Sequence, residues 1–312
     1  MEESEKSLSG VLPIVHLPFT DEDQIDETCL RRELDWAFQQ GANGCGTGMV
    51  SEIQRLTGKE RKHLANLIPE IVGGRGLVFA SVGAESTKQA VSWAKDAEDA
   101  GNDALMAIPP TLSSLSEQAL LDYFEALAES TQLPLIVQDA SSYVGQQIPL
   151  RVLTTLLEKF GSQKILFKPE ADPLGPNLSA LREATSGEAR IFEGSGGIML
   201  LDSYRRGIAG TMPGMDLLDG IVATWKALEQ GEEDKAYEIH FPICSMISMQ
   251  MQAGLDGFIA IEKHLMVKRG IFENTRRRLP YKWTPDEETL DEVDRVFDRL
   301  LKKLDEQKSC KS

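Results

Sequence analysis

The chain has 312 residues, 41% of them hydrophobic, and a formal net charge of −16 at pH 7. This length suffices for one large α/β barrel or for two smaller domains. A strongly acidic surface repels nucleic acids and anionic lipids, and no apolar run reaches the roughly 20 residues of a membrane span. We therefore expect no nucleic-acid or membrane partner, although a local pocket could still bind a small anion.

The cysteines and histidines are scattered along the chain. No two cysteines have C-x-x-C spacing and no two histidines lie four residues apart, so neither a metal site nor a disulfide framework is predicted. Residues 1–9 are polar and acidic and lack the apolar core of a signal peptide. These features favour a cytoplasmic protein with reduced thiols. The residues concerned are Cys29, Cys45, Cys244, Cys310, His16, His63, His240 and His264.

After residues 1–9, which we expect to be disordered, short apolar runs alternate with segments of helical periodicity. Gly41, Gly101 and Gly161 each follow a helical pattern, and glycine commonly ends a helix. Buried strands are expected at 10–17, 43–48, 76–82, 104–108, 133–138, 165–168, 190–193 and 208–212. Helices are expected at 26–40, 58–72, 86–100, 116–130, 149–160, 178–185, 197–206 and 216–229.

The expected strands are continuous apolar runs rather than alternating ones. This pattern is typical of parallel strands that are covered on both faces. Eight strand–helix units close naturally as a (β/α)8 barrel, which we place at residues 10–230. A doubly wound open sheet usually needs fewer units, and the phosphate-binding pattern G-x-G-x-x-G is absent after the first strand.

The strand pattern stops after the eighth unit. Three further helices are expected at 232–252, 257–269 and 285–304, and they would form a C-terminal three-helix domain at 231–304. The last residues, 305–312, are charged and are expected to fray. The chain is thus predicted to be an α/β protein with a helical appendage.

One predicted strand, Ile165-Leu166-Phe167-Lys168, ends in a lysine. Active groups of a (β/α)8 barrel lie at the carboxyl ends of the strands. Desolvation there favours the neutral amine, which can attack the carbonyl of a 2-oxo acid and form an iminium that acts as an electron sink. The alternative is an ordinary strand-end lysine whose amine lies in solvent.

Other residues at strand ends complete the predicted site. Gln138 could orient the carbonyl or a water molecule, and Glu170 is a candidate general base, although it could instead be a salt-bridged surface carboxylate. Ser51 could bind the substrate carboxylate through its hydroxyl or amide, or could simply cap a helix. The predicted catalytic residues are Lys168, Gln138 and Glu170, and the predicted substrate-binding residues are Val50, Ser51, Thr111, Gly194, Ser195 and Met212.

Several runs along residues 10–304 occur in the order and at the spacing of a known family. They are Pro13-Ile14-Val15-His16-Leu17-Pro18-Phe19, Gly48-Met49-Val50-Ser51-Glu52, Leu133-Pro134-Leu135-Ile136-Val137, Phe167-Lys168, Glu193-Gly194-Ser195-Gly196 and Gly207-Ile208-Ala209-Gly210. The chain resembles the dihydrodipicolinate synthase / N-acetylneuraminate lyase family of class I Schiff-base lyases. The resemblance implies that Lys168 forms the Schiff base, that no cofactor or metal is needed, and that the protein is a homo-tetramer or homo-dimer.

The chain differs from that family at the positions of the residues that transfer protons. Gln138 stands where the family usually has a tyrosine, and a neutral amide cannot carry a proton at neutral pH. Thr111 stands in place of a second tyrosine, and Tyr143 lies near the position of the synthases' substrate-binding arginine. Met49 and Val50 replace residues that usually include a hydroxyl. These departures disfavour dihydrodipicolinate synthesis.

Three short patterns resemble the 2-keto-3-deoxy-pentonate dehydratase branch of the family. They are Ser51-Glu52, Gln138-Asp139-Ala140 and Phe167-Lys168-x-Glu170. We therefore predict a dehydratase of 2-keto-3-deoxy sugar acids. The alternatives are a pyruvate-dependent aldolase, a dihydrodipicolinate synthase-like enzyme, and a non-catalytic barrel that binds 2-oxo acids.

Overall fold

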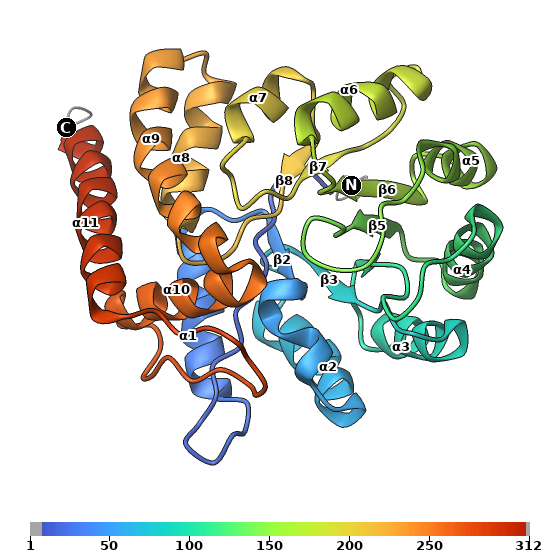
Figure 1. The fold of residues 1–312 in the computed structure, drawn as a ribbon, viewed down its shortest axis with the longest axis horizontal. Helices are drawn as coiled ribbons and strands as arrows, with labels where there is room; N and C mark the ends of the chain where they lie inside the picture. The colour runs from blue at the N-terminus through green and yellow to red at the C-terminus, as the bar shows by residue number, and fades with distance from the viewer. Residues whose placement is uncertain (1–7, 310–312) are drawn as a thin grey trace.

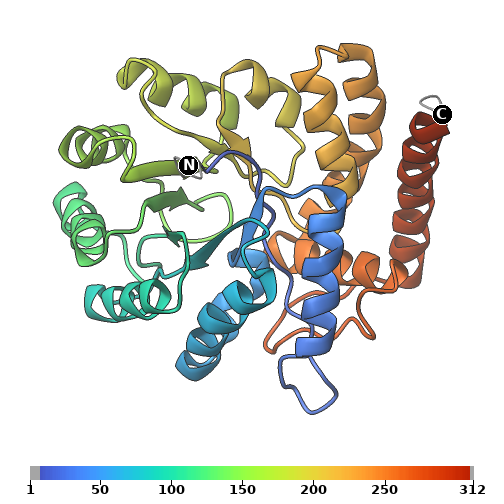
Figure 2. The same cartoon turned by 180° about the vertical axis from the view of Figure 1, so that it is seen from behind.

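The computed structural model describes residues 8–309, and its centre is a closed barrel of parallel strands (Figures 1 and 2). Five strands pair in the order β2-β3-β4-β5-β6 and three in the order β1-β8-β7. Two bridges join these groups, Ile14 with Gly46 and Phe167 with Ile191. The strands are β1 (Gly10–Val11), β2 (Gly44–Gly46), β3 (Leu77–Ser81), β4 (Ala104–Ala107), β5 (Leu135–Asp139), β6 (Ile165–Pro169), β7 (Phe192–Glu193) and β8 (Gly210–Thr211).

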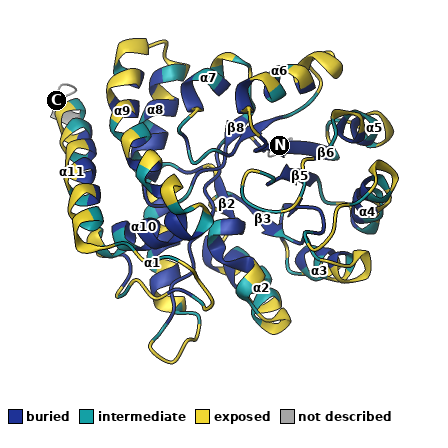
Figure 3. Ribbon diagram, in the orientation of Figure 1, coloured by how far each residue is buried: buried dark blue, intermediate teal, exposed yellow. Residues whose placement is uncertain are grey.

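Both faces of each long strand are buried, which explains why the apolar runs are continuous. Alternate side chains such as Phe79, Met106 and Leu166 fill the barrel interior. Their neighbours, including Leu105 and Phe167, pack outward against the helices. Figure 3 shows the buried strands at the centre and helices whose outer faces are exposed. The prediction of a (β/α)8 barrel is confirmed.

Helices follow the strands and form the outer layer of the barrel (Figure 1). Their ends carry the expected capping groups: Asp26 accepts a hydrogen bond from the Cys29 amide, and Gly41 ends the first helix in the left-handed conformation. The helices are α1 (Glu27–Gln40), α2 (Gly58–Val72), α3 (Thr87–Asp99), α4 (Glu117–Ser130), α5 (Leu150–Phe160), α6 (Leu174–Ala184), α7 (Leu200–Arg205) and α8 (Leu218–Glu229).

Three helices follow the barrel: α9 (Glu233–Gln250), α10 (Leu255–Lys268) and α11 (Glu287–Ser309). α9 lies beside α8, and α11 packs along α9 on the outside of the molecule (Figure 1). None of the described helices is both long and apolar enough to cross a membrane. Of the segments expected to be disordered or frayed, 1–7 and 310–312 lie outside the described residues. Leu8 is buried in the barrel interior, and α11 continues to Ser309.

Candidate active site

Side chains on β5 and β6 alternate between the barrel interior and the outer helices. This alternation continues to the carboxyl ends of both strands, at the mouth of the barrel. Ile136 and Leu166 point into the interior, so Gln138 and Lys168, two residues further along each strand, point the same way. The strand register pairs Gln138 with Lys168. Both side chains are buried, and only 4% of Lys168 is exposed. The lysine amine therefore lies inside the mouth rather than in solvent.

Glu170 follows β6 and directs its carboxylate toward these two side chains. Its Oε1 lies 3.2 Å from Lys168 Nζ, and its Oε2 accepts a 2.5 Å hydrogen bond from Gln138 Nε2. Burial raises the pKa of the Glu170 carboxyl, and the positive charge of Lys168 opposes this rise. Lysine, carboxylate and amide thus form one buried group that can combine a nucleophile with a general base.

These three side chains line a small pocket with a cavity volume of about 40 Å³. Two more polar side chains, Tyr143 and Glu262, line it. The rest of the wall is apolar side chains or glycine backbone, from Ile14, Met49, Val50, Gly194, Gly196, Met212, Gly214, Leu255 and Phe258. The pocket is suited to a small molecule with a few polar groups.

Tyr143 lies on the loop after β5 and reaches the same pocket. Its ring packs edge-on against Phe258 of α10, with 5.8 Å between ring centroids. Burial raises the pKa of its hydroxyl, and the carboxyl groups of Glu170, Glu193 and Glu262 add to the rise. The hydroxyl therefore stays protonated at neutral pH and can donate a hydrogen bond into the pocket. From the sequence, Tyr143 was noted only as lying near the position of the synthases' substrate-binding arginine.

Val50, Gly194 and Met212, which were predicted to bind substrate, line the pocket, and their contacts with substrate remain predictions. Gly194 passes very close to the reactive group. A Cβ atom at this position would lie 2.6 Å from Lys168 Cε and 2.6 Å from Glu170 Cγ. The absence of a side chain at 194 thus leaves the room that Lys168 and Glu170 occupy.

Ser51 is buried but does not line the pocket. Its hydroxyl donates to the Val15 carbonyl and accepts from the Gly48 amide, so it fixes the loop after β2. The next residue, Glu52, has a left-handed backbone with φ of 53° and pairs with Lys263 of α10 at 2.5 Å. A contact of Ser51 with substrate remains a prediction.

Ser195 and Thr111 also have other contacts. The Ser195 amide and hydroxyl both bind the Glu193 carboxylate. The Thr111 hydroxyl donates to Glu85 at 2.6 Å, beside a separate pocket. The structure does not bring these two side chains next to Lys168, and their roles in substrate binding also remain predictions.

α10 contributes three pocket residues that sequence reasoning missed: Leu255, Phe258 and Glu262. They belong to a helix that we expected to be part of a separate appendage, so strand-end positions gave no reason to choose them. One signal was available. Glu262 and Lys263 are adjacent charges within an otherwise apolar stretch, and buried charges usually have partners or a function.

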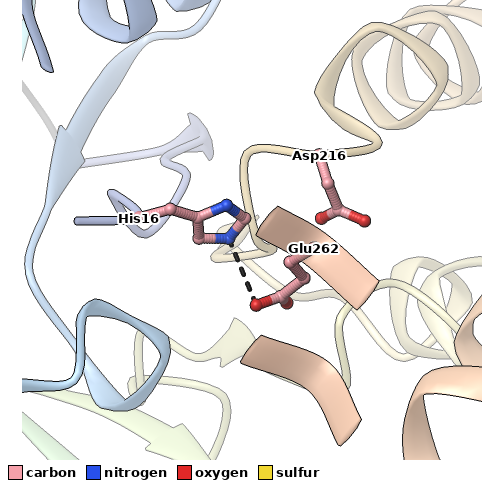
Figure 4. Close-up of side chains that lie close together, drawn as sticks. All are labelled: His16, Asp216 and Glu262. Atoms are coloured by element: carbon pink, nitrogen blue, oxygen red, sulfur yellow. Dashed lines mark ion pairs between the residues drawn. The ribbon is translucent and has the colours of Figure 1, made fainter. Parts of the chain in front are cut away.

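Glu262 also belongs to a cluster with His16 and Asp216, shown in Figure 4. One potential ligand atom from each lies within 4.8 Å of the others, and all three residues are buried. An imidazole nitrogen and two carboxylates could hold a divalent cation. The His16 ring nitrogen Nε2 already lies 3.3 Å from the Met215 amide, which can donate to it, and Asp216 accepts from Gln250. Burial lowers the pKa of His16 to about 3, so the ring is neutral.

The comparisons with known proteins agree with this architecture. The model of the dihydrodipicolinate synthetase family matches residues 7–299. A 4-hydroxy-tetrahydrodipicolinate synthase from Methanosarcina acetivorans is 26% identical over 245 residues, which cover 76% of this chain and 81% of the relative.

Solved structures of similar fold cover almost the whole chain. The 4-hydroxy-tetrahydrodipicolinate synthase of Methylacidiphilum fumariolicum SolV superposes with a TM-score of 0.86 at 25% identity, over 96% of this chain and 98% of that one. YagE, a protein of the dihydrodipicolinic acid synthase family from E. coli K12 solved in complex with pyruvate, has a TM-score of 0.85 at 23% identity, over 94% and 98% of the two chains. At that identity the likeness to YagE concerns the fold alone.

Proposed function

The chain belongs to the dihydrodipicolinate synthetase family and is a lyase of that family, and from this premise we propose that it dehydrates a 2-keto-3-deoxy sugar acid through a Schiff base on Lys168. The observation that carries the proposal is the buried group of Lys168, Glu170 and Gln138 at the ends of β5 and β6. No cofactor enters the proposed reaction, because the iminium itself supplies the electron sink.

In the first step, Lys168 Nζ attacks the C2 ketone of the substrate and water leaves, which gives a cationic iminium. Glu170 lies 3.2 Å from this nitrogen. The lysine gives up a proton before the attack, and the departing hydroxyl takes up a proton as it leaves as water. The iminium that results is cationic, so the Glu170 carboxylate faces a positive charge at the end of this step.

In the second step, Glu170 removes a proton from C3 and the electron pair moves toward the iminium nitrogen, which gives an enamine. The C4 hydroxyl then leaves as water after it takes the proton back from Glu170. Loss of a C5 proton and addition of a proton at C3 give an enol at C4 and C5. Loss of the enol hydroxyl proton and addition of a proton at C4 give the C5 aldehyde, and water then releases a 2-oxo semialdehyde from the lysine. The Gln138 amide, hydrogen-bonded to Glu170, orients the base.

Two features of the pocket favour dehydration over the synthase reaction. Gln138 cannot move a proton at neutral pH, and it occupies the position that the family resemblance gives to a proton-carrying tyrosine. Among the described residues that line the pocket there is no arginine to receive the carboxylate of a second substrate. Glu170 supplies the proton-transfer group that the tyrosine would otherwise provide.

The second candidate is a pyruvate-dependent aldolase or a dihydrodipicolinate synthase-like enzyme. The names of two similar proteins favour it, since those of Methanosarcina acetivorans and Methylacidiphilum fumariolicum SolV are both 4-hydroxy-tetrahydrodipicolinate synthases. The same Schiff base would serve, but the C3–C4 bond would form or break while the C4 hydroxyl exchanged its proton.

Product analysis separates the two candidates. The purified enzyme is incubated with 2-keto-3-deoxy-pentonate and the products are identified by mass spectrometry. A 2-oxo semialdehyde that has lost one water supports the dehydratase. Pyruvate together with a two-carbon aldehyde would instead establish aldol cleavage and contradict our proposal.

We also propose that residues 10–230 form the catalytic barrel and 231–304 a helical domain. We expect a homo-tetramer or homo-dimer that works in the cytoplasm on a small-molecule 2-oxo acid. The support for assembly is the family resemblance together with exposed apolar side chains, notably Leu112 and Phe241, which are 84% and 64% exposed in the single chain.

A further inference from the structure

A second carboxyl group, Glu262 of α10, lines the same pocket as Lys168. Glu262 is only 3% exposed, yet its Oε2 atom has no hydrogen-bond partner among the described residues. This atom lies 3.3 Å from His16 Nε2, which already faces the Met215 amide at 3.3 Å. A buried acceptor without a hydrogen bond is costly, so a ligand that donates one would be favoured here.

Gly214 has no side chain, which leaves space in the pocket wall next to the Glu262 carboxyl group. A Cβ atom on Gly214 would lie 2.8 Å from Glu262 Oε1, 2.9 Å from Asp216 Oδ1 and 3.0 Å from His16 Nε2. Three polar atoms therefore converge at a part of the wall that carries no side chain, and Gly214 itself lines the pocket. Figure 4 shows the side chains of His16, Asp216 and Glu262 close together.

The charges around this wall do not suit a second carboxylate on the substrate. Lys168 is the only cation among the described lining residues, and the Schiff base uses it. The nearby cations are already paired, Lys263 with Glu52 and Arg269 with Asp219. Burial raises the pKa of the Glu262 carboxyl, and a second substrate carboxylate would likewise be buried here without a counter-charge. A hydroxyl can both donate and accept a hydrogen bond, and it adds no charge.

We propose that Glu262 binds a hydroxyl group on the tail of the 2-oxo acid, so that the site selects hydroxylated tails over tails that end in a second carboxylate. The proposal rests on the proposed Schiff-base function of Lys168. Glu262 is thereby a specificity-determining residue, which a substrate reaches through the space at Gly214.

Borohydride trapping measures this selection without requiring turnover. The amount of trapped adduct is followed by mass spectrometry against the concentration of pyruvate, 2-keto-3-deoxy-pentonate or 2-oxoglutarate. We expect the wild-type enzyme to reach half-saturation at the lowest concentration with the hydroxylated acid. Glu262→Ala should raise that concentration about 10-fold or more relative to the value for pyruvate. Glu262→Gln, which keeps a hydrogen-bonding group, should restore part of the selection.

Glu33→Gln is the matched control, because Glu33 is a buried neighbour of His16 that does not line the pocket. It should leave the selection unchanged. The proposal would be overturned if Glu262→Ala raised the half-saturating concentrations of pyruvate and of the hydroxylated acid equally. A wild-type preference for 2-oxoglutarate would also overturn it. So would selection that appears only with added Mn²⁺, which would make the cluster a cation site. Failure of the wild-type enzyme to trap pyruvate would instead refute the Schiff-base function.

Discussion

The Glu170 carboxylate divides its two oxygens between Lys168 and Gln138. Because one oxygen faces the nucleophile, the carboxylate can reach protons near the carbon bound to that nitrogen. Because the other is held by an amide, the base keeps its orientation while the lysine changes from ammonium to iminium. Nucleophile and base therefore have separable roles, and substitutions should affect them differently.

Substituting Glu170 should slow proton transfer without preventing Schiff-base formation. We predict that Glu170→Gln lowers kcat for a 2-keto-3-deoxy sugar acid by about 10²- to 10⁴-fold, the usual contribution of a positioned general base. Trapping with pyruvate should persist. Glu85→Gln, which alters a carboxylate beside the separate pocket at Thr111, is the control. Unchanged turnover in Glu170→Gln would remove Glu170 from the mechanism.

The pH profile of the wild-type enzyme should report the same carboxyl group. The base works as a carboxylate, and burial raises the pKa of Glu170 above the ordinary value of about 4.3. Activity should therefore be full above the raised pKa and lost as the pH falls through it. We predict an acidic limb in kcat/KM that lies above the ordinary glutamate range and disappears in Glu170→Gln. A wild-type profile that stays flat down to pH 4.3 would contradict this.

The reactive group also depends on a missing side chain. Gly194→Ala would place a methyl group 2.6 Å from both Lys168 Cε and Glu170 Cγ. We predict that this variant stays folded, by circular dichroism, but loses most of its pyruvate trapping because the two side chains are displaced. Gly58→Ala, where an added Cβ meets nothing within 4 Å, should trap normally. Normal trapping in both variants would show that the close approach at 194 is unimportant.

Residues near the ends of strands could be found from the sequence, but their contacts could not. Lys168, Gln138 and Glu170 were identified because strand ends converge at the barrel mouth. The hydroxyls of Ser51 and Ser195 were chosen by the same rule, yet local partners occupy them. Which partner a hydroxyl finds depends on loop geometry of a few ångströms, and sequence spacing does not determine it.

Among the elements, α10 connects the C-terminal helices to the active site. Glu262 lines the pocket, and the next residue, Lys263, pairs with Glu52 on the loop after β2. Both partners of this pair are about 1% exposed. Burial lowers the pKa of Lys263 to about 8, and the Glu52 carboxylate opposes this effect. The pair therefore ties the helix to a loop that forms one wall of the pocket.

Removing one partner of this pair should lower the free energy of unfolding strongly, whereas replacing both partners with apolar residues should not. We predict that Lys263→Met lowers the free energy of unfolding by about 3–5 kcal/mol, because Glu52 is left buried without its counter-charge. Lys263→Met combined with Glu52→Leu should recover much of the loss. Lys62→Met, which breaks the exposed pair with Asp96, should change stability little. The measurement is urea unfolding, and a double variant no more stable than the single one would contradict the interpretation.

Element boundaries differed from expectation where proline interrupts a pattern. The first strand was expected at 10–17, but β1 ends at Val11 because Pro13 lacks an amide for the ladder, and pairing resumes only as a bridge at Ile14. α6 begins at Leu174 rather than 178, since Pro176 falls in its first turn, where a missing amide costs nothing. The strand and helix types were otherwise recovered from apolar periodicity.

For the whole molecule, the order of strands and helices was sufficient to predict the barrel. Eight buried strands alternating with helices have few ways to cover both faces of every strand, and closure is the simplest. The placement of the last three helices was not predictable in the same way. Nothing in their sequence periodicity specifies that α10 lies at the mouth and supplies Glu262, because that depends on packing between distant segments.

The central claim is that this barrel forms a covalent Schiff base at Lys168. The direct measurement is reduction with borohydride in the presence of pyruvate, followed by peptide mass spectrometry of the wild type and of Lys168→Ala. We predict an adduct on Lys168 of the wild type, none on Lys164 just before the same strand, and none in Lys168→Ala. A wild type that forms no adduct, or an equal adduct in Lys168→Ala, would contradict the claim.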